Sequence, residues 1–333
     1  MTLKDKDRFE RLKKTLGRNY KITQLYASYL NNCPEAITKN LIDSVCSDSD
    51  ITEKDAVVAL LSELFGLDFG NGAEDRILIR QYITPSVRIL TPKKYTENPY
   101  YKNVKIKNVT DGAWELKTEA YEPYRAVICD DIEIKDDLTE IPPLGFFKER
   151  FEFPAVLEGG NEWMTLTPVD MDTCEVAISE AHGKVVTFGL GLGYYAYMVS
   201  IKDDVDSITV IEKSPDVIRL FEKYIFPYFP KKDKVKVINA DAFEYAEKIM
   251  PAERFDYAFV DTWRDASDGA PMYEKMKPLE LLNPDTEFSY WISGFIRSRI
   301  RSQRYEKILS DLNSGNADSW DSYEKIESYL TQI

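Results

Sequence analysis

The sequence predicts an α/β fold whose main part is a doubly wound parallel sheet, preceded by an accessory region of helices and a small β part. From Val185 onward, apolar strand-like runs alternate with helical segments, which is typical of a parallel sheet covered on both faces. A glycine-rich turn follows the first of these runs, and acidic residues end or follow the others. The four runs cover residues 185–188, 207–212, 234–239 and 255–261.

The N-terminal region, residues 1–70, is predicted to be helical. Apolar residues recur there at helical spacing between residues 3 and 66, and the pattern divides into four short helices, the last ended by Gly66. We expect these helices to cover the main domain or to form a lid or an interaction surface.

Residues 71–160 are predicted to form a small, mostly β subdomain. Prolines interrupt short alternating runs there, such as 104–106 and 114–118, and Gly159-Gly160 marks a turn.

The remaining residues, 161–333, are assigned to the ligand-binding domain. Residues 168–181 are expected to be helical and to lead into the first strand. The segment 278–333 is expected to be largely helical, and a fifth strand fits only residues 286–291.

Composition limits the classes of partner. The 333 residues are 44% hydrophobic, enough for about two folded domains, and the net charge is −14. An acidic chain is repelled by phosphate backbones and anionic lipid, so neither nucleic acid nor a membrane surface is expected as the main partner. A basic run (Arg297, Arg299, Arg301 and Arg304) is interpreted as a solvated helix face.

Cysteine and histidine usage points to a reducing compartment and away from metal. The four cysteines are far apart and form no Cys-x-x-Cys, and His182 is the single histidine, so we expect no metal site and no Ser-His-Asp triad. The first residues are charged and lack an apolar signal core, and no long apolar span follows. We therefore expect a cytoplasmic protein.

The glycine turn is the first element of a candidate nucleotide site. Gly189, Gly191 and Gly193 alternate after the strand, where a missing Cβ permits a tight turn and close approach of a ligand. The following helix directs its free amide groups toward that ligand. Leu190 and Tyr194 are assigned to the same site.

The other strand ends supply acidic side chains. Glu212, followed by Lys213, ends the second strand and is placed to accept hydrogen bonds from both ribose hydroxyls. Asp241, followed by Ala242, comes after the third strand and is placed to receive an exocyclic adenine amine. Asp261 ends the fourth strand.

With these motifs, residues 183–265 resemble the Rossmann-like core of the class I S-adenosylmethionine-dependent methyltransferases. The resemblance implies that the three glycines line the methionine portion of S-adenosylmethionine. It further implies that Glu212 holds the ribose, that Asp241 and Ala242 hold the adenine, and that Asp261 faces the methionine amine or the substrate.

The chain departs from the family pattern in two places. Thr187 stands where the family often has an acid that contacts the cofactor's amino group. The fourth strand ends in residues 261–264 as Asp-Thr-Trp-Arg, not in the Asn/Asp-Pro-Pro-Tyr motif of enzymes that methylate exocyclic base or amide nitrogens. The motif of that substrate class is therefore absent from the end of the fourth strand.

Two other ligand types match parts of the sequence. Residues 191–196 match the dinucleotide pattern G-x-G-x-x-A, but the strand ends at Phe188, which makes Gly189 the first turn glycine and leaves Tyr194 where a glycine is expected. The sequence is also similar to the aminopropyltransferases (spermidine synthases), since Asp265 and Asp268 follow Asp261 in an acid-rich loop. That family's Tyr-His pair is absent, and helix capping is the favoured role of these two aspartates.

The sequence therefore predicts a transferase that uses S-adenosylmethionine to methylate a small-molecule or peptide-borne acceptor, with Asp261 as the candidate catalytic residue. Aminopropyl transfer from decarboxylated S-adenosylmethionine and cofactor binding without turnover are the alternatives. Trp163, Met164, Thr165 and Thr167 either cover the cofactor or belong to ordinary packing. A homo-oligomer is left open.

Overall fold

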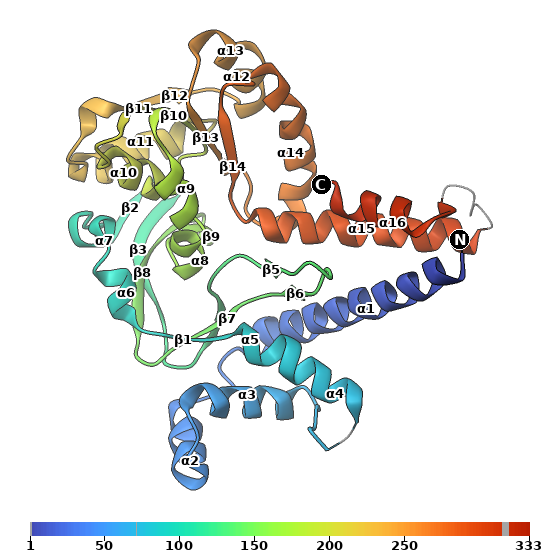
Figure 1. Cartoon of the computed structure of the whole chain (residues 1–333). Helices are drawn as coiled ribbons and strands as arrows, with labels where there is room; N and C mark the ends of the chain where they lie inside the picture. Colours follow the sequence, from blue (N-terminus) through green and yellow to red (C-terminus); the bar gives the residue numbers. More distant parts are fainter. Residues whose placement is uncertain (1, 71, 315–319) are drawn as a thin grey trace. The chain divides into compact units, whose positions relative to one another are not determined.

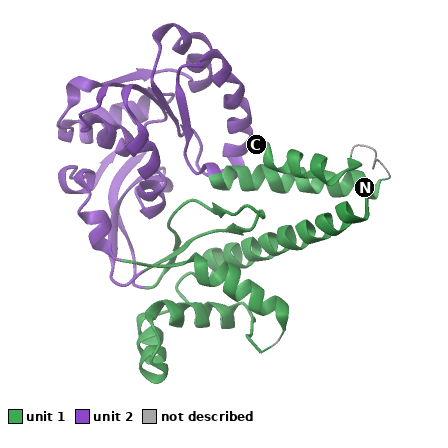
Figure 2. Ribbon diagram, viewed as in Figure 1, with its two compact units in different colours: residues 1–90, 124–146, 294–333 green, residues 91–123, 147–293 purple. Residues whose placement is uncertain are grey.

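The computed structural model describes residues 2–70, 72–314 and 320–333. The chain forms two compact units that are interleaved in sequence (Figure 2). Unit 1 comprises Met1–Leu90, Tyr124–Phe146 and Gly294–Ile333, and unit 2 comprises Thr91–Pro123 and Phe147–Ser293. The three consecutive segments expected from the sequence do not coincide with these units, because residues 124–146 and 294–333 belong with the N-terminal helices.

Unit 2 contains the predicted parallel sheet. Its five strands are β10 (Gly183–Phe188), β11 (Val205–Glu212), β12 (Val235–Asn239), β13 (Tyr257–Val260) and β14 (Glu287–Tyr290). The strand order is β12-β11-β10-β13-β14, and every neighbouring pair is parallel. The direction of winding reverses between β10 and β13, which in such sheets opens a crevice at the carboxyl ends of the strands. The predicted fold class and all five predicted strands are confirmed.

Helices cover both faces of this sheet, with α10 and α11 on one side and α12 to α14 on the other (Figure 1). Val185, Val186 and Phe188 of the central strand are fully buried, as expected of a strand covered on both faces. The helices are α10 (Tyr194–Ser200), α11 (Pro215–Tyr224), α12 (Ala242–Lys248), α13 (Met250–Glu253) and α14 (Ala266–Met276), with 3₁₀ turns η2 (Phe226–Tyr228), η3 (Lys232–Lys234) and η4 (Lys277–Leu282).

An antiparallel sheet precedes the parallel one in unit 2. Its order is β2-β3-β8-β9, and Gly159 and Gly160 form the predicted turn between β8 and β9 with positive φ values of 57° and 81°. The run 104–106 is not a strand, contrary to prediction, because α7 ends just before it and no partner strand pairs with it among the described residues. The strands are β2 (Val109–Asp111), β3 (Trp114–Tyr121), β8 (Phe151–Glu158) and β9 (Asn161–Thr165), and the helices around them are α6 (Pro92–Thr96), α7 (Pro99–Asn103), α8 (Pro168–Asp172) and α9 (Glu175–Glu180).

Unit 1 begins with a single long helix where two short ones were predicted. Helix α1 (Leu3–Asn32) runs through Gly17, whose position is open to solvent on the side where a Cβ would stand. A mid-helix glycine costs about 1 kcal/mol, and burial of apolar residues on both sides of it, such as Leu12 and Ile22, offsets that cost. Helical structure also extends over residues 73–86, where the β region was expected to begin. The further elements are α2 (Lys39–Ser49), α3 (Glu53–Leu64), α4 (Ala73–Leu78), the π-helix η1 (Ile79–Ile83) and α5 (Thr84–Ser86).

The basic run in the last helices of unit 1 is a solvated face only in part: Arg297 and Arg299 are exposed, as expected, but Arg301 is not. The side chain of Arg301 is buried and forms an ion pair with Glu140, and its Nε donates to the carbonyl oxygen of Leu330 (3.2 Å). Glu140 also accepts a hydrogen bond from Ser298 (2.7 Å). Helical periodicity could not reveal a partner some 160 residues away. These elements are α15 (Ser293–Asn313) and α16 (Tyr323–Thr331), with the strands β1 (Val87–Leu90), β4 (Ala126–Ile128), β5 (Glu133–Ile134), β6 (Glu140–Ile141) and β7 (Leu144–Phe147).

No helix in the described part of the chain is long and apolar enough to cross a membrane.

Candidate functional site

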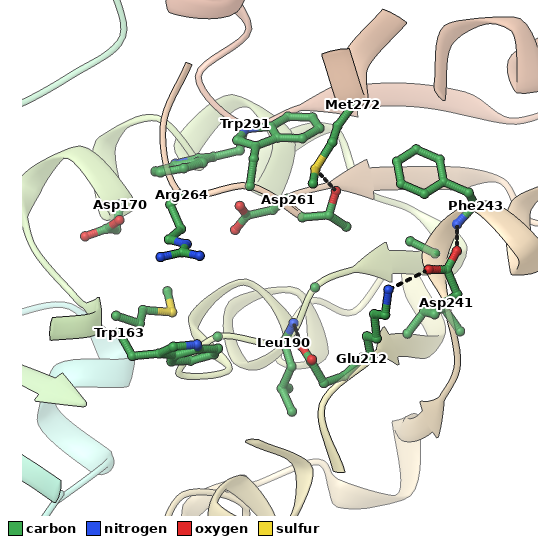
Figure 3. Close-up of a pocket in the computed structure, with 18 of the residues that line it drawn as sticks. Trp163, Asp170, Leu190, Glu212, Asp241, Phe243, Asp261, Arg264, Met272 and Trp291 are labelled. Carbon is green, nitrogen blue, oxygen red and sulfur yellow. Dashed lines mark hydrogen bonds and ion pairs between the residues drawn. The ribbon is translucent and has the colours of Figure 1, made fainter. Parts of the chain in front are cut away.

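A cavity of about 430 Å³ lies in unit 2 at the carboxyl ends of the parallel strands (Figure 3). Its wall is built by strand β9, the start of α8, the glycine turn, and the residues that follow β11, β12, β13 and β14. This is the crevice that the reversal between β10 and β13 creates. Side chains and backbone come from Glu162, Trp163, Met164, Thr165, Asp170, Gly189, Leu190, Gly191, Ile211, Glu212, Lys213, Ala240, Asp241, Ala242, Phe243, Asp261, Thr262, Trp263, Arg264, Met272 and Trp291.

The glycine turn forms one edge of the cavity. Gly189 and Gly191 have φ values of 102° and 50°, in the left-handed region that favours glycine. A Cβ on Gly189 would collide with the carbonyl oxygen of Asp261, and one on Gly191 would collide with the sulfur of Met164. The first two predicted glycines therefore permit close packing around the cavity.

The third glycine and the tyrosine after it lie outside the main cavity. Gly193 (φ 72°) precedes α10, and a Cβ there would collide with the ring of Phe221. Tyr194 is buried, and its hydroxyl accepts a hydrogen bond from Nδ2 of Asn98 (3.0 Å). It lines a smaller adjoining cavity of about 30 Å³. In this structure both residues serve the packing of α10.

Glu212 lies at the end of β11 and is fixed by backbone amides. Its Oε2 accepts from the amide of Leu190 (3.2 Å), and its Oε1 accepts from the amide of Ser214 (2.7 Å). A carboxylate offers about four acceptor positions, so two further donors can be bound by the same group. Glu212 thus joins the glycine turn to the second strand and keeps capacity for a diol.

Asp241 and Lys213 form an ion pair across the next part of the wall, with 3.2 Å between Nζ and Oδ2. Oδ1 of Asp241 caps α12 by accepting from the amides of Phe243 (3.0 Å) and Glu244 (3.2 Å). Burial raises the pKa of Asp241, but the hydrogen bonds from Glu244 and Lys213 outweigh it and hold the pKa below its usual range. Asp241 is therefore a charged acceptor beside the apolar side chain of Ala242.

Asp261 follows β13 and faces a second carboxyl group, that of Asp170 in α8. Burial, followed by the charges of Asp170 and Glu212, raises the pKa of Asp261 to about 8. Burial also raises the pKa of Asp170 to about 6, against two hydrogen bonds from Thr167 to its Oδ2 (2.7 and 2.8 Å). Near neutral pH these two carboxyl groups therefore hold one proton between them, with Asp261 mostly protonated and Asp170 mostly ionised.

The part of the cavity remote from Asp241 is lined by two tryptophans, Trp163 and Trp291, and by the cationic side chain of Arg264 (Figure 3). Trp163 is held by an edge-to-face contact with Trp114, with ring centroids 5.5 Å apart. Its neighbours Met164 and Thr165 also line the cavity, whereas Thr167 caps α8. The indole nitrogen of Trp263 is buried and has no hydrogen-bond partner among the described residues.

The aspartates of the acid-rich loop cap a helix. Asp265 is the N-cap of α14, and Asp268 returns the bond to the backbone amide of Asp265 (3.0 Å), forming a capping box. Neither residue lines the cavity. The helix-capping interpretation of these two residues is confirmed.

Several lining residues were not singled out from the sequence. Phe243 directly follows Asp241-Ala242, so its neighbourhood was a usable signal. Asp170 and Trp291 lie on elements before and after the predicted motifs, and only the folded chain brings them to the crevice. In the described ranges, no cluster of three or more His, Cys, Asp or Glu residues has the arrangement of a metal site.

Comparison with known proteins gives similarity to solved structures only. No family model matches the sequence, and no curated protein matches it. The spermidine synthase from Thermotoga maritima is similar over 46% of this chain and 59% of its own, at 16% identity and a TM-score of 0.31. A spermidine synthase in complex with the transition state analogue AdoDATO is similar over 46% of this chain and 60% of its own, at 18% identity and a TM-score of 0.35.

A third similar structure is precorrin 8W decarboxylase of Methanobacterium thermoautotrophicum, at 18% identity, a TM-score of 0.28, and coverage of 43% of this chain and 70% of that one. The chain thus spans 59–60% of the length of the spermidine synthases it resembles. The α/β assignment rests on the parallel sheet itself.

Proposed function

We propose that this protein is an S-adenosylmethionine-dependent methyltransferase with a small-molecule or peptide-borne acceptor. The observation that carries the proposal is the convergence of the glycine turn with three acidic strand ends, Glu212, Asp241 and Asp261, on one cavity. In open parallel sheets, this crevice is where nucleotide ligands bind.

The lining fits the parts of that ligand in order along the cavity. The free acceptor positions of Glu212 suit the two ribose hydroxyls. Asp241 offers a charged acceptor to the exocyclic amine of adenine, and the ring of Phe243, with Ala242, supplies an apolar surface for the base. Gly189 and Gly191 leave room for the chain that joins the ribose to the methionine end.

The residues of the chain then position the reaction. The sulfonium of S-adenosylmethionine supplies an electrophilic methyl group, so the protein's task is to hold an acceptor in line with it. Five lining carboxyl side chains favour binding of a cation. Asp261 can accept the acceptor's proton once it is ionised, and the positive charge of a bound sulfonium favours that ionisation by lowering its pKa from about 8.

Aminopropyl transfer is the second candidate, and one observation favours it. The adjacent carboxyl groups of Asp170 and Asp261 also suit the ammonium group of an aminopropyl chain. Against it, Asp265 and Asp268 are engaged in helix capping and do not reach the cavity.

Calorimetric titration of the purified protein with four ligands tests the proposal. We expect S-adenosylmethionine and its thioether product, S-adenosylhomocysteine, to bind, and NAD not to bind. Preference for decarboxylated S-adenosylmethionine would instead support aminopropyl transfer. Binding of NAD alone would refute the proposal, and a bound cofactor that no acceptor consumes would indicate a binding module without turnover.

A further inference from the structure

The charges of the cavity wall single out one cation. Five lining side chains carry carboxyl groups, and two, Lys213 and Arg264, are cationic. Lys213 is engaged by Asp241. The guanidinium of Arg264 makes no hydrogen bond or ion pair with the residues described. After the hydrogen bonds from Ser267 and Asp268, its positive charge contributes to the lowered pKa of Asp265. Figure 3 shows this side chain directed into the cavity, on the side of Asp261 remote from Asp241.

A second feature is the carboxyl group of Asp170, which lies beside the glycine turn. Thr187 of β10 lies beside the glycine turn and carries no charge. Asp170 lines the small adjoining cavity together with Thr187 and Gly189, and it also lines the main cavity. Both hydrogen bonds from Thr167 go to its Oδ2, so Oδ1 takes no part in the capping box. Asp170 therefore brings an acid from α8 to the place that the strand itself leaves neutral.

An α-amino-acid group requires two partners, a cation for its carboxylate and a carboxylate for its ammonium group. A carboxylate that enters a cavity with five acidic side chains is repelled unless a cation meets it, and burial of an unpaired charge is costly. A guanidinium binds a carboxylate with two parallel hydrogen bonds, and a carboxylate binds an ammonium. Arg264 and Asp170 provide these partners at the same end of the cavity (Figure 3).

We infer that Arg264 binds the carboxylate, and Asp170 the ammonium, of the α-amino-acid group of the methyl donor. This inference rests on the proposed function and adds the residues that select the intact donor over its decarboxylated form. Arg264 is then a specificity-determining residue, because the decarboxylated form retains the ammonium and lacks the carboxylate.

The test compares three ligands on the full-length protein by calorimetry: S-adenosylmethionine, decarboxylated S-adenosylmethionine, and methylthioadenosine, which lacks the amino-acid group. Loss of a charge-assisted hydrogen bond weakens binding by about tenfold or more. Arg264→Gln should weaken the binding of S-adenosylmethionine by that factor and leave the affinity for the decarboxylated form unchanged. Asp170→Asn should weaken the binding of both donors and leave the affinity for methylthioadenosine unchanged. The asparagine keeps a side-chain oxygen that can accept the hydrogen bonds from Thr167.

Lys213→Gln is the matched control, because it removes the other lining cation, and it should change the affinities for the intact and decarboxylated donors by the same factor. An unchanged ratio of these two affinities in Arg264→Gln would overturn the inference while leaving the proposed function in place. So would equal affinity of the wild-type protein for S-adenosylmethionine and methylthioadenosine. If the wild-type protein binds none of the three ligands, the proposed function fails and the inference fails with it.

Discussion

The Asp261 carboxyl group should make the stability of unit 2 depend on pH in an unusual direction. Its pKa is about 8 in the folded protein against an ordinary value of 3.8. Between these values the folded state holds a proton that the unfolded state has lost. The stabilising contribution is therefore complete below about pH 4 and is lost as the pH rises toward about 8.

The size of the effect follows from the same linkage. One proton of difference changes the free energy of unfolding by about 1.4 kcal/mol per pH unit. The pKa of Asp170 is about 6, so the interval from about pH 6 to 7.5 reports mainly on Asp261. The wild-type protein should lose at most about 2 kcal/mol over that interval, since partial exposure of Asp261 screens the effect.

Urea unfolding followed by tryptophan fluorescence measures this loss, because Trp263 and Trp291 lie in the same cavity wall. In Asp261→Asn the side chain cannot ionise, and the loss between the two pH values should disappear. Asp206→Asn, at an exposed aspartate of β11, is the control and should behave as the wild type. If Asp261→Asn loses as much stability as the wild type, burial does not raise this pKa and the reasoning is wrong.

Five further substitutions, at four positions, test other parts of the account. Gly189→Ala should lower the free energy of unfolding by about 3 kcal/mol or more, because the new Cβ meets backbone. Gly191→Ala should cost only about 1–2 kcal/mol, because a flexible thioether can move aside; equal losses in thermal unfolding would contradict this. Asp241→Ala should lose about 1 kcal/mol with the helix cap, whereas Asp241→Asn keeps the cap and should weaken only adenosine binding by calorimetry. Glu140→Ala should cost about 3–5 kcal/mol in urea unfolding, because Arg301 is left buried without its partner, and a loss below 1 kcal/mol, as for an exposed pair, would refute that.

The parallel sheet could be predicted because its signals are local. Strands covered on both faces are apolar runs, and Phe188 and Glu212 each stand at the end of such a run, so the sequence alone placed the turn and the acidic residue. Helix ends were harder to predict. Gly17 resembles a helix terminator, but buried residues on both sides carry α1 through it.

The remainder of the site depends on contacts that no local pattern encodes. Asp170 lies in a five-residue helix and faces Asp261 only because α8 packs beside the carboxyl edge of the sheet. Trp291 follows β14 and meets the cavity because the carboxyl ends of the parallel strands lie at one edge of the sheet. The same limit hid the partner of Arg301, which comes from strand β6.

The most direct test of the central claim is a crystal structure of the protein with S-adenosylhomocysteine. The account predicts adenine beside Asp241 and Phe243, the ribose hydroxyls on Glu212, and the amino-acid group directed toward Asp170. A ligand bound outside this cavity, or bound in it with the ribose away from Glu212, would contradict the account.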